Sequence, residues 1–593
     1  MLISELYDGQ GFGNQLWSYV FTRVLSSDKN LQFGIQCPEK FKGRGFLDLD
    51  MGQQVVGGSG PEGGPPTELP DGINYYYSER VILHPKRDVD IRVLDSGFQE
   101  VVDNTKIEGI FQAEDYIAHR KEDIRGWLRY EPKQLDIDFS DPDICVINFR
   151  GGEYKGNPKI FLRRKYWIDA VAHIESINPN VKFVVITDDP PAARRFFPRY
   201  SIRHYGIHGD YQAINTASYL IVSNSSFAFF PAWLNRRAKI CVAPKYWAAH
   251  NESDGYWSCS YNITRNWLYL DREGECSSGE QCISELSDYQ DLHTHMYAQK
   301  KIDDSIVVVS SYSHDLSWLP RYTNDYFVYE RGTGSGLPPQ LNRAKVRFVS
   351  NNGSNFKDYF NFIVENYESL PDVVYLIKGN VFPRHVRQHV FDASLSHKVP
   401  HSIIDKKKHR TTFPLDFFGR DGMYYELNSD WFVHTGAPWR YFNSVDSFLA
   451  HFDKSHKHKM YTRFSIGAQY VVSRETIRQI PKHVYQDLCE IVSHGGEPIG
   501  YTAECYIVER SMDRLWQNPP GVLLDVERKL HQLNMVSNTE LRKSILFKTE
   551  LALLDLSAQL INNTSSLVLK VLSASCNRYR LIRNFYGGGA SKW

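Results

Sequence analysis

Between residues 144 and 236 the chain alternates short apolar runs with longer segments whose apolar residues recur at helical spacing. This alternation predicts βαβ units, in which parallel strands form one sheet and helices cover its two faces. The ligands of such sheets bind at the carboxyl ends of the strands, so the residues that follow each strand are the first candidates for a functional site. The predicted strands are Ile144–Phe149, Val181–Thr187 and Tyr219–Val222, and the predicted helices are Lys165–Ile177, Tyr211–Ser218 and Phe227–Arg236.

The length of 593 residues exceeds what one hydrophobic core can organise, so several domains are expected. A polar stretch with Gly and Ser, residues 273–304, precedes a second strand-like run at Ser305–Ser310. Further strands are expected at Tyr326–Tyr329 and Val373–Ile377, with a helix at Asn355–Glu368. The predicted organisation is a domain at 1–272 with lobes of about 1–140 and 141–272, a linker at 273–304, a second α/β domain at 305–525 and a helical tail at 526–593.

Acidic and basic residues balance at 69 each, so the chain has no net field that would hold it on nucleic acid or on an anionic membrane. No apolar run reaches the roughly 18 residues that a membrane-spanning helix needs. The nine Cys show neither zinc-ribbon nor redox-pair spacing, which favours reduced thiols. A Gly-rich turn begins within ten residues of Met1, so no signal peptide is expected. We therefore predict a cytoplasmic protein, with any peripheral contact to the inner face of the plasma membrane made through the C-terminal tail.

Three segments of the first half combine glycines, hydroxyls and an arginine, namely Asp8–Trp17, Cys145–Tyr154 and Ile221–Trp233. A transferase that uses no metal has to neutralise a departing diphosphate with an arginine, backbone amides and hydroxyls near a helix start. Arg150 follows a predicted strand, and its planar guanidinium can bind two phosphate oxygens. The run Ser223–Ser226 lies between a predicted strand and a predicted helix, where hydroxyls and amides can face the same phosphates.

These segments resemble the inverting fucosyltransferase superfamily, and in particular glycosyltransferase family 11, the α-1,2-fucosyltransferases. Residues 11–15, Gly-Phe-Gly-Asn-Gln, are similar to that family's Gly-Leu-Gly-Asn-Gln opening. Asn148–Tyr154 is similar to its His-x-Arg-Arg-Gly-Asp-Tyr segment, and Thr187–Asp189 to its Ser-Asp-Asp strand end. Ser223–Asn235 is similar to its Asn-Ser-(Ser/Thr)-Phe-x-Trp-Trp-x-Ala-Trp-Leu block. The resemblance covers about residues 1–270.

The resemblance implies a GT-B fold of two Rossmann-like lobes, and transfer of fucose from GDP-fucose with inversion and with no metal or other cofactor. It implies that Arg150 holds the β-phosphate, that Asp210 lies near the guanine and that the opening glycine turn closes over the sugar. The implied nucleotide-sugar contacts are Gly11, Gly13, Asn14, Gln15, Arg150, Asp188, Asp210, Ser223, Asn224, Ser225 and Ser226.

The chain departs from the family pattern at three positions of the arginine segment. Asn148 stands for His, Gly151 for the second Arg and Glu153 for Asp. One positive charge is therefore missing, which leaves another sugar nucleotide open as the donor. Glu153 is the carboxylate nearest in sequence to Arg150, and we predict two alternative roles for it. It either deprotonates the acceptor hydroxyl as a catalytic base or only orients Arg150.

The second half carries Tyr312–Trp318, Tyr329–Gly332, Asn351–Pro371, Ile377–Asn380 and Gly467–Arg474. These segments resemble an uncharacterised domain family of bacteria and fungi, and the resemblance implies a second glycosyltransferase-like domain.

A GT-A-like enzyme that uses Mn²⁺ or Mg²⁺ needs two carboxylates spaced Asp-x-Asp after a strand. Lys378-Gly-Asn380 stands there instead, so either the metal is absent or a lysine takes its place as counter-charge. We therefore assign no metal ligands, and a divalent metal in this half remains open without support. The predicted catalytic residues are Asp315 and Glu509, and the further polar candidates are His314, Glu365 and Glu504.

Together these features predict a bifunctional glycosyltransferase of bacterial surface polysaccharide synthesis, such as that of O-antigen or capsule. The first half would transfer fucose or a related sugar from a GDP-sugar, and the second half would add another sugar to the same glycan. One alternative is a single transferase followed by a non-catalytic glycan-binding or docking module, and another is a scaffold without transferase activity. The predicted partners are a nucleotide sugar and a glycan or lipid-linked glycan acceptor, with no nucleic acid, and a homo-oligomer is left open.

Overall fold

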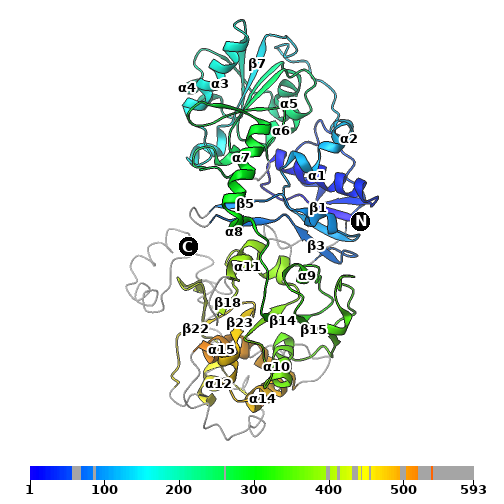
Figure 1. Cartoon of the computed structure of the whole chain (residues 1–593), viewed down its shortest axis with the longest axis vertical. Coiled ribbons are helices and arrows are strands. Elements are labelled where there is room, and N and C mark those ends of the chain that lie inside the picture. The colour runs from blue at the N-terminus through cyan, green and yellow to red at the C-terminus, as the bar shows by residue number, and fades with distance from the viewer. Residues whose placement is uncertain are drawn as a thin grey trace. The chain divides into compact units, whose positions relative to one another are not determined.

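The structure is a computed structural model that describes residues 1–55, 69–84, 89–258, 262–395, 401–409, 415–429, 439–442, 444–452, 456–494, 502–517 and 536–537. The chain divides into two compact units, Met1–Gln299 and Lys300–Trp593 (Figure 1). Both contain largely parallel sheets with helices, which confirms the predicted α/β class. Of the expected helical tail, the structure describes Val536–Ser537 alone, which form the short strand β24 paired with β21 (Trp439–Arg440).

The first unit begins with a four-stranded sheet in the order β2-β1-β6-β3, in which every pairing is parallel. Between β1 and β2 the chain forms α1 (Phe12–Asp28). The strands are β1 (Leu2–Glu5), β2 (Phe33–Gln36), β3 (Tyr75–Ser78) and β6 (Thr105–Glu108). The smaller elements are η1 (Pro38–Lys40), β4 (Val81–Leu83), β5 (Asp90–Arg92), η2 (Ser96–Glu100), η3 (Glu114–Tyr116), η4 (Ala118–Arg120) and α2 (Lys121–Trp127).

The second sheet of this unit has the order β13-β12-β11-β10-β7-β8-β9, and every pair except β12 with β13 is parallel. Helices cover both faces, with α3 and α4 on one side and α5 and α6 on the other (Figure 1). The strand β7 therefore needs apolar residues at successive positions, and Cys145 and Ile147 face one core while Ile144 and Val146 face the other. The strands are β7 (Ile144–Phe149), β8 (Lys182–Thr187), β9 (Ser201–Arg203), β10 (Tyr219–Val222), β11 (Ile240–Pro244), β12 (Leu268–Leu270) and β13 (Cys276–Ser278), and the helices are α3 (Arg164–Ile177), α4 (Pro190–Phe196), α5 (Gly206–Thr216) and α6 (Ser226–Trp233), with η5 (Gly152–Gly156) and η6 (Trp247–Ala249) between them.

The two sheets of the first unit are joined through contact between α1 and α6. The Trp17 ring of α1 lies 4.3 Å from the Phe229 ring and 4.9 Å from the Phe230 ring, measured between centroids. Closer to the start of both helices, a Cβ placed on Gly13 would lie 2.2 Å from the carbonyl carbon of Ser226. Only glycine allows this approach of the two backbones.

The stretch 273–304, which we expected to be a linker, contains β13, α7 (Gly279–Leu292) and α8 (Thr294–Tyr297) and lies almost entirely in the first compact unit. The side chain of Ser278 and that of Gln281 cap α7 reciprocally. The helix also buries Cys282 and Leu286 in the core of the unit. The polar composition that suggested a linker belongs to the exposed face of this helix.

The main sheet of the second unit has the order β16-β15-β14-β17-β23-β18. From β14 the chain moves outward through β15 to β16 and then returns to place β17 on the other side of β14, so the strand order reverses between β14 and β17. The pairings among β16, β15, β14 and β17 are parallel, whereas β23 runs antiparallel to β17. The strands are β14 (Ser305–Ser311), β15 (Tyr326–Glu330), β16 (Val346–Phe348), β17 (Val373–Lys378), β18 (His401–Ser402) and β23 (Tyr470–Ser473).

Helices and a small sheet complete the second unit. Val308 and Leu376 face a core built with α10, α14 and α15, while Val309 and Ile377 face the opposite core. A separate antiparallel sheet has the order β19-β20-β22. The elements are α9 (Leu319–Tyr322), η7 (Arg343–Lys345), α10 (Ser354–Asn366), η8 (Val381–His385), α11 (Gln388–Ser394), β19 (Phe417–Phe418), β20 (Tyr424–Leu427), α12 (Val445–Phe452), β22 (Tyr461–Phe464), α13 (Arg474–Arg478), α14 (Lys482–Ser493) and α15 (Ala503–Gln517).

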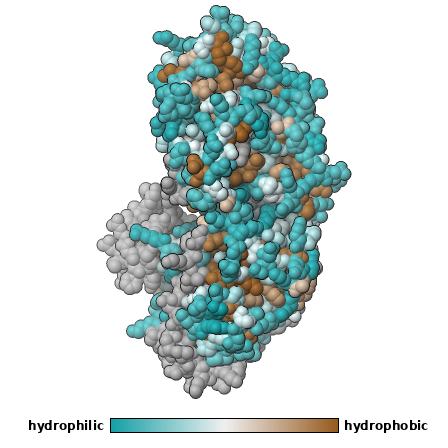
Figure 2. Space-filling view, viewed as in Figure 1, coloured by the Kyte–Doolittle hydropathy of each residue, from teal (hydrophilic) through white to brown (hydrophobic). Residues whose placement is uncertain are grey.

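Large apolar side chains that reach solvent are scattered along the described chain, among them Ile168, Leu292 and Phe348. Figure 2 accordingly shows a mostly hydrophilic face with separate apolar patches. Within the described residues, none of the helices combines the length and the hydropathy that crossing a bilayer requires.

We expect Gly13→Ala to lower the stability of the protein by about 1–3 kcal/mol, because the added methyl group meets the Ser226 backbone and has no space to move into. Denaturant unfolding with a tryptophan fluorescence readout measures the effect. The matched control is Gly126→Ala in α2, where the new methyl group meets nothing within 4 Å. A Gly13→Ala protein as stable as the control would show that the two helices are not in close contact.

Candidate functional site

The three polar segments predicted in the first unit meet at one edge of its second sheet. Asn148 of β7 lies opposite Val222 of β10, so Arg150 and Ser223 leave neighbouring parallel strands at the same edge. Phe149 lies opposite Thr187 of β8, which brings Asp188 to that edge as well. The contact of Gly13 with Ser226 adds the start of α1. The structure therefore places the segments together, as the sequence pattern predicts.

Arg150 is held by two carboxylates at this edge. Its guanidinium lies 2.8 Å from an Asp188 oxygen and 3.2 Å from a Glu153 oxygen. The central carbon of its guanidinium, Cζ, lies 5.5 Å from the centre of the Tyr154 ring, a cation–π distance. The Nε atom is buried and has no hydrogen-bond partner in the described part of the chain. The arginine is thus oriented in advance, with one donor left unused.

The glycines beside Arg150 make room for carboxylates of the chain itself. The amide of Gly151 donates to Asp188 at 3.0 Å. A Cβ on Gly151 would lie 2.5 Å from the Cβ of Asp189, and one on Gly152 would lie 2.4 Å from an Asp188 oxygen. Asp189 is itself fixed, because it caps α4 by accepting from the Ala192 amide at 3.1 Å. The position where the resembling family has a second arginine therefore has no space for a side chain.

Of the four residues Ser223–Ser226, the first three use their side chains in hydrogen bonds within the fold. The Ser223 hydroxyl donates to the side-chain oxygen of Asn148 at 2.9 Å, and the side-chain amide of Asn224 donates to the Ile160 carbonyl at 2.8 Å. Ser225 caps α6 through the Phe227 amide at 3.4 Å. Ser226 is half-buried and begins the helix, so its amide and hydroxyl lie at the helix N-terminus, where the helix dipole attracts anions.

The residues at the start of α1 have unequal roles. Gln15 is fully buried and holds the next loop through the Lys40 carbonyl and the Lys42 amide, each at 2.9 Å. Asn14 accepts from Gln112 at 2.8 Å. Gly11 is exposed, and a Cβ there would meet nothing within 4 Å. Of the sugar contacts predicted in this turn, Gly11 lies at the surface. Gln15 instead holds the loop that contains Lys40 and Lys42.

Asp210 is buried on α5, and both of its oxygens are engaged. One accepts from the Tyr205 amide and the other from His204, each at 2.8 Å. Burial raises the pKa of this carboxyl, and the nearby charge of Asp188 raises it further. Asp210 therefore lies close to the site, but its oxygens are occupied by its own segment.

In the second unit the predicted catalytic residues occupy different surroundings. The carboxylate of Asp315 accepts from the amide and the hydroxyl of Ser317, at 2.8 and 3.0 Å, in a local turn. Glu509 of α15 accepts from the Gly467 amide at 3.1 Å, and its charge acts on Lys378 at the end of β17. His314 lies against Gly379, in the loop after β17.

The other two polar candidates of this unit have structural partners. Glu365 lies 2.6 Å from Arg347 at the surface. Glu504 is fully buried and accepts from the Tyr441 amide at 2.6 Å and from His494 at 2.9 Å. Sequence reasoning missed His385 and His409, which lie against Gly467, because these contacts are made across long stretches of chain. The charge of Lys378, at the end of β17, acts on both imidazoles.

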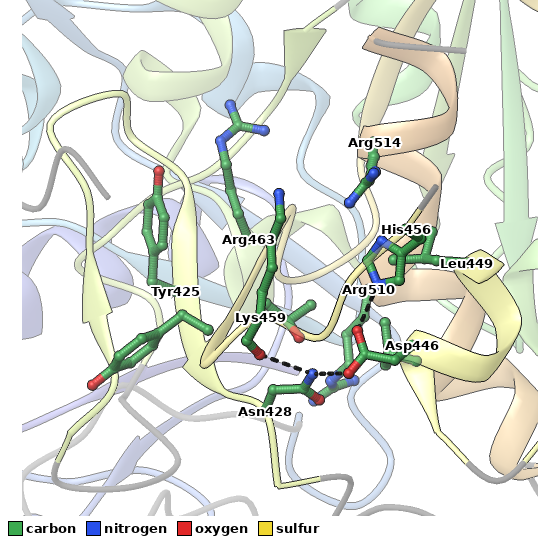
Figure 3. A pocket seen from close by; sticks show the side chains of 12 residues that line it. Tyr425, Asn428, Asp446, Leu449, His456, Lys459, Arg463, Arg510 and Arg514 are labelled. Atoms are coloured by element: carbon green, nitrogen blue, oxygen red, sulfur yellow. Dashed lines mark hydrogen bonds and ion pairs between the residues drawn. The ribbon is translucent and has the colours of Figure 1, made fainter. Parts of the chain in front are cut away.

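A cavity of about 410 Å³ lies between the small sheet, α12 and α15. Figure 3 shows Arg463, Lys459 and Arg514 at one side of it and Asp446 with Asn428 at the other. The full lining is Tyr425, Asn428, Val445, Asp446, Leu449, His456, Lys459, Tyr461, Thr462, Arg463, Arg510 and Arg514.

Much of the charge around this cavity is paired within the protein. Arg510 binds both oxygens of Glu426 at 2.7 Å. Asp446 accepts from His456 at 2.6 Å and from Asn428 at 2.9 Å, and the Nδ1 atom of His456 is buried with no partner among the described residues. Such a mixture of donors, acceptors and aromatic rings suits a ligand with several hydroxyl groups.

Within the described ranges, no group of three or more His, Cys, Asp and Glu side chains is arranged to hold a metal ion.

Comparisons with known proteins confirm the two predicted resemblances. Residues 306–518 match the family described as a protein of unknown function, DUF3431. The N-terminal part is similar to alpha-1,2-colitosyltransferase of Escherichia coli, with 27% identity over 186 residues that cover 28% of this chain. The match spans 62% of the length of that relative. Among solved structures, the glycosyl transferase family 9 protein from Veillonella parvula DSM 2008 is similar at 11% identity with a TM-score of 0.25, covering 48% of this chain and 96% of that one.

We expect Gly151→Arg, the change that restores the family's second arginine, to destabilise the protein instead of strengthening anion binding. The new side chain would push against Asp189 and disturb the cap of α4. The matched control is Gly156→Arg, in the same loop, where a Cβ meets nothing within 4 Å. Thermal unfolding should show a lower midpoint for Gly151→Arg alone, and equal midpoints for the two variants would contradict the packing explanation.

Proposed function

We propose that the first unit is a GT-B glycosyltransferase that moves fucose or a related sugar, with inversion, from a GDP-sugar to a hydroxyl of a bacterial surface glycan. Colitose is one candidate sugar, because the similar protein of Escherichia coli is named for its transfer. The single observation that carries the proposal is the convergence of Arg150, the start of α6 and the start of α1 at the carboxyl ends of β7, β8 and β10.

Arg150 would neutralise the departing diphosphate, aided by the N-terminus of α6. A diphosphate arriving from solvent has to compete with two carboxylates for the guanidinium. The side chain of Glu153 is 76% exposed and lies 3.2 Å from Arg150, whereas that of Asp188 is 26% exposed and lies 2.8 Å away. Glu153 is therefore the partner that the ligand displaces first, and Asp188 keeps Arg150 in place.

Displacement of Glu153 from Arg150 by the diphosphate would allow Glu153 to have both of its predicted roles, one after the other. Before the donor binds, Glu153 helps to orient Arg150. After displacement, its carboxylate is released beside the diphosphate site and can accept the proton of an acceptor hydroxyl. The same side chain would thus act as an orienting group first and as a base afterwards.

For the second unit we propose transfer of another sugar to the same glycan by a GT-A-like domain. Support comes from the reversal of strand order between β14 and β17, because ligands of open α/β sheets bind at such a point. Two transferases in one chain keep the first product at a high effective concentration near the second site.

A glycan-binding module without catalysis is the second candidate for this unit, and the cavity in Figure 3 favours it. Tyr425 and Tyr461 line that cavity together with paired charges, a composition that suits a sugar with several hydroxyl groups. Replacement of Glu509 by Gln separates the two candidates, since only a transferase would lose the second sugar while its acceptor affinity is kept.

We expect Arg150→Ala to lower kcat/KM for sugar transfer by roughly 10²–10³-fold, because a fixed donor to the leaving diphosphate is removed. Product formation from GDP-fucose and GDP-colitose, followed by chromatography, measures the loss. Arg236→Ala is the control, since Arg236 is exposed and paired with Glu122. If Arg150→Ala transferred sugar at the wild-type rate, this edge of the sheet would not be the donor site.

We expect Glu153→Gln to lower kcat by roughly 10²–10⁴-fold, as loss of a general base does. Its affinity for GDP should stay equal or rise, because one carboxylate that competes for Arg150 loses its charge. Isothermal titration calorimetry and steady-state kinetics measure the two quantities separately. Weaker GDP binding with an unchanged kcat would instead limit Glu153 to orienting Arg150.

A further inference from the structure

The strongest unassigned feature lies in the second unit, where the strand order reverses between β14 and β17. Lys378, the last residue of β17, lies opposite Ser310 of β14 in the parallel register. Its ammonium is therefore carried on a rigid strand at the edge where open α/β sheets bind their ligands. The five residues of β17 before it, Val373–Ile377, carry no charge, so Lys378 is the first charge that the chain presents there.

Three histidines surround this strand end. A Cβ on Gly379, the residue after Lys378, would lie 2.9 Å from Nδ1 of His314. A Cβ on Gly467, just before β23, would lie 3.3 Å from Nδ1 of His385 and 3.2 Å from Cε1 of His409. The His385 and His409 rings stack at 5.8 Å between centroids. Two glycines thus allow the backbone to pass close to imidazoles at the same edge.

The cluster carries more positive than negative groups. Burial lowers the pKa of His314 and of His409 to about 4, and the charges of Lys378 and Arg384 contribute in the same direction. The pKa of His385 is lowered as well, first by burial and then by Lys378. These imidazoles are therefore neutral near neutral pH, and the positive charges of the cluster are those of Lys378 and Arg384, which an anionic ligand would offset.

The nearby carboxylates do not fill this need. Asp358 and Asp405 each bind an arginine through two oxygens, at 2.7 and 2.9 Å and at 2.7 and 3.0 Å respectively. Glu330 accepts three hydrogen bonds from the loops beside it. Among the described carboxylates, Glu509 is the one whose charge acts on Lys378, and no ion pair within 4 Å joins the two.

Polar atoms without partners point to a missing ligand. Gln469 is 1% exposed; its oxygen accepts from the Lys378 amide at 3.1 Å, while its Nε2 donor has no partner in the described part of the chain. The Nε2 atom of His409 and the side-chain oxygen of Asn380 are also buried and unpartnered among the described residues. Buried polar atoms are almost always satisfied. Acceptor oxygens of a ligand would satisfy the Gln469 donor, whereas the Asn380 oxygen needs a donor such as a hydroxyl group of the same ligand.

We propose that this cluster binds the diphosphate of a nucleotide-sugar donor, with Lys378 as the fixed counter-charge and with Gln469 and the surrounding imidazoles as further hydrogen-bonding groups. The inference rests on the proposed transferase role of the second unit and names its donor class. Lys378 would supply here the charge that an Asp-x-Asp motif supplies through a metal ion in other enzymes of this general type, and the imidazoles would add hydrogen bonds.

The test measures binding of inorganic diphosphate and of UDP to the full-length protein by isothermal titration calorimetry. All variants carry Arg150→Ala, which weakens the site of the first unit. We expect Lys378→Gln to raise the Kd for both probes at least tenfold, and Arg384→Gln to raise it by a smaller factor because Arg384 is exposed. The matched control is Lys345→Gln, since Lys345 binds the Asn324 carbonyl at 2.6 Å, beside the start of β15 at the opposite edge of the sheet.

The outcomes separate this inference from the proposed function. Diphosphate binding that is absent, or equally strong in Lys378→Gln and Lys345→Gln proteins, overturns the inference. If Lys378→Gln alone fails to fold, as judged by circular dichroism, the Arg384→Gln protein decides the question, because the inference predicts a weaker affinity there too. Binding that depends on Lys378 without transfer of a second sugar supports the inference and removes the transferase role. Transfer of a second sugar at an unchanged rate in the Lys378→Gln protein supports the transferase role and overturns the inference.

Discussion

The contact between the starts of α1 and α6 is the constraint on which the first unit depends. Gly13 meets the Ser226 backbone so closely that no other residue fits, and Trp17 continues the contact into a core shared by both sheets. Two loops that lie more than two hundred residues apart in sequence are thereby fixed side by side. Because this contact is steric, packing fixes the starts of the two helices relative to each other.

The two units differ in whether the basic residue of the proposed site has a carboxylate partner. In the first unit Arg150 is already paired with Asp188 and Glu153, so an anion at the proposed donor site would have to replace an existing partner. In the second unit Lys378 has no carboxylate within ion-pair distance among the described residues, and an anion would supply the partner that is lacking.

Local pattern was sufficient for two strands that are covered on both faces. The bounds of β7 and β10 equal the predicted ones, because every residue in them is buried and the flanking polar residues end the run sharply. Specific side-chain contacts between distant segments could not be predicted from the sequence. The clash that excludes a side chain at Gly151 depends on Asp189, and the association of Lys378 with His409 depends on a third segment, Gly467. The role of Gln15 in holding a loop was hidden for the same reason.

The helix α7 moves the C-terminal boundary of the first unit beyond the predicted residue 272. Its buried face supplies Cys282 and Leu286 to the core, and β13 before it forms the last strand of the second sheet. A chain cut at residue 272, the end suggested by composition, would lose that strand and open the core to water. A separately produced first unit should therefore extend to Gln299, where the compact unit ends.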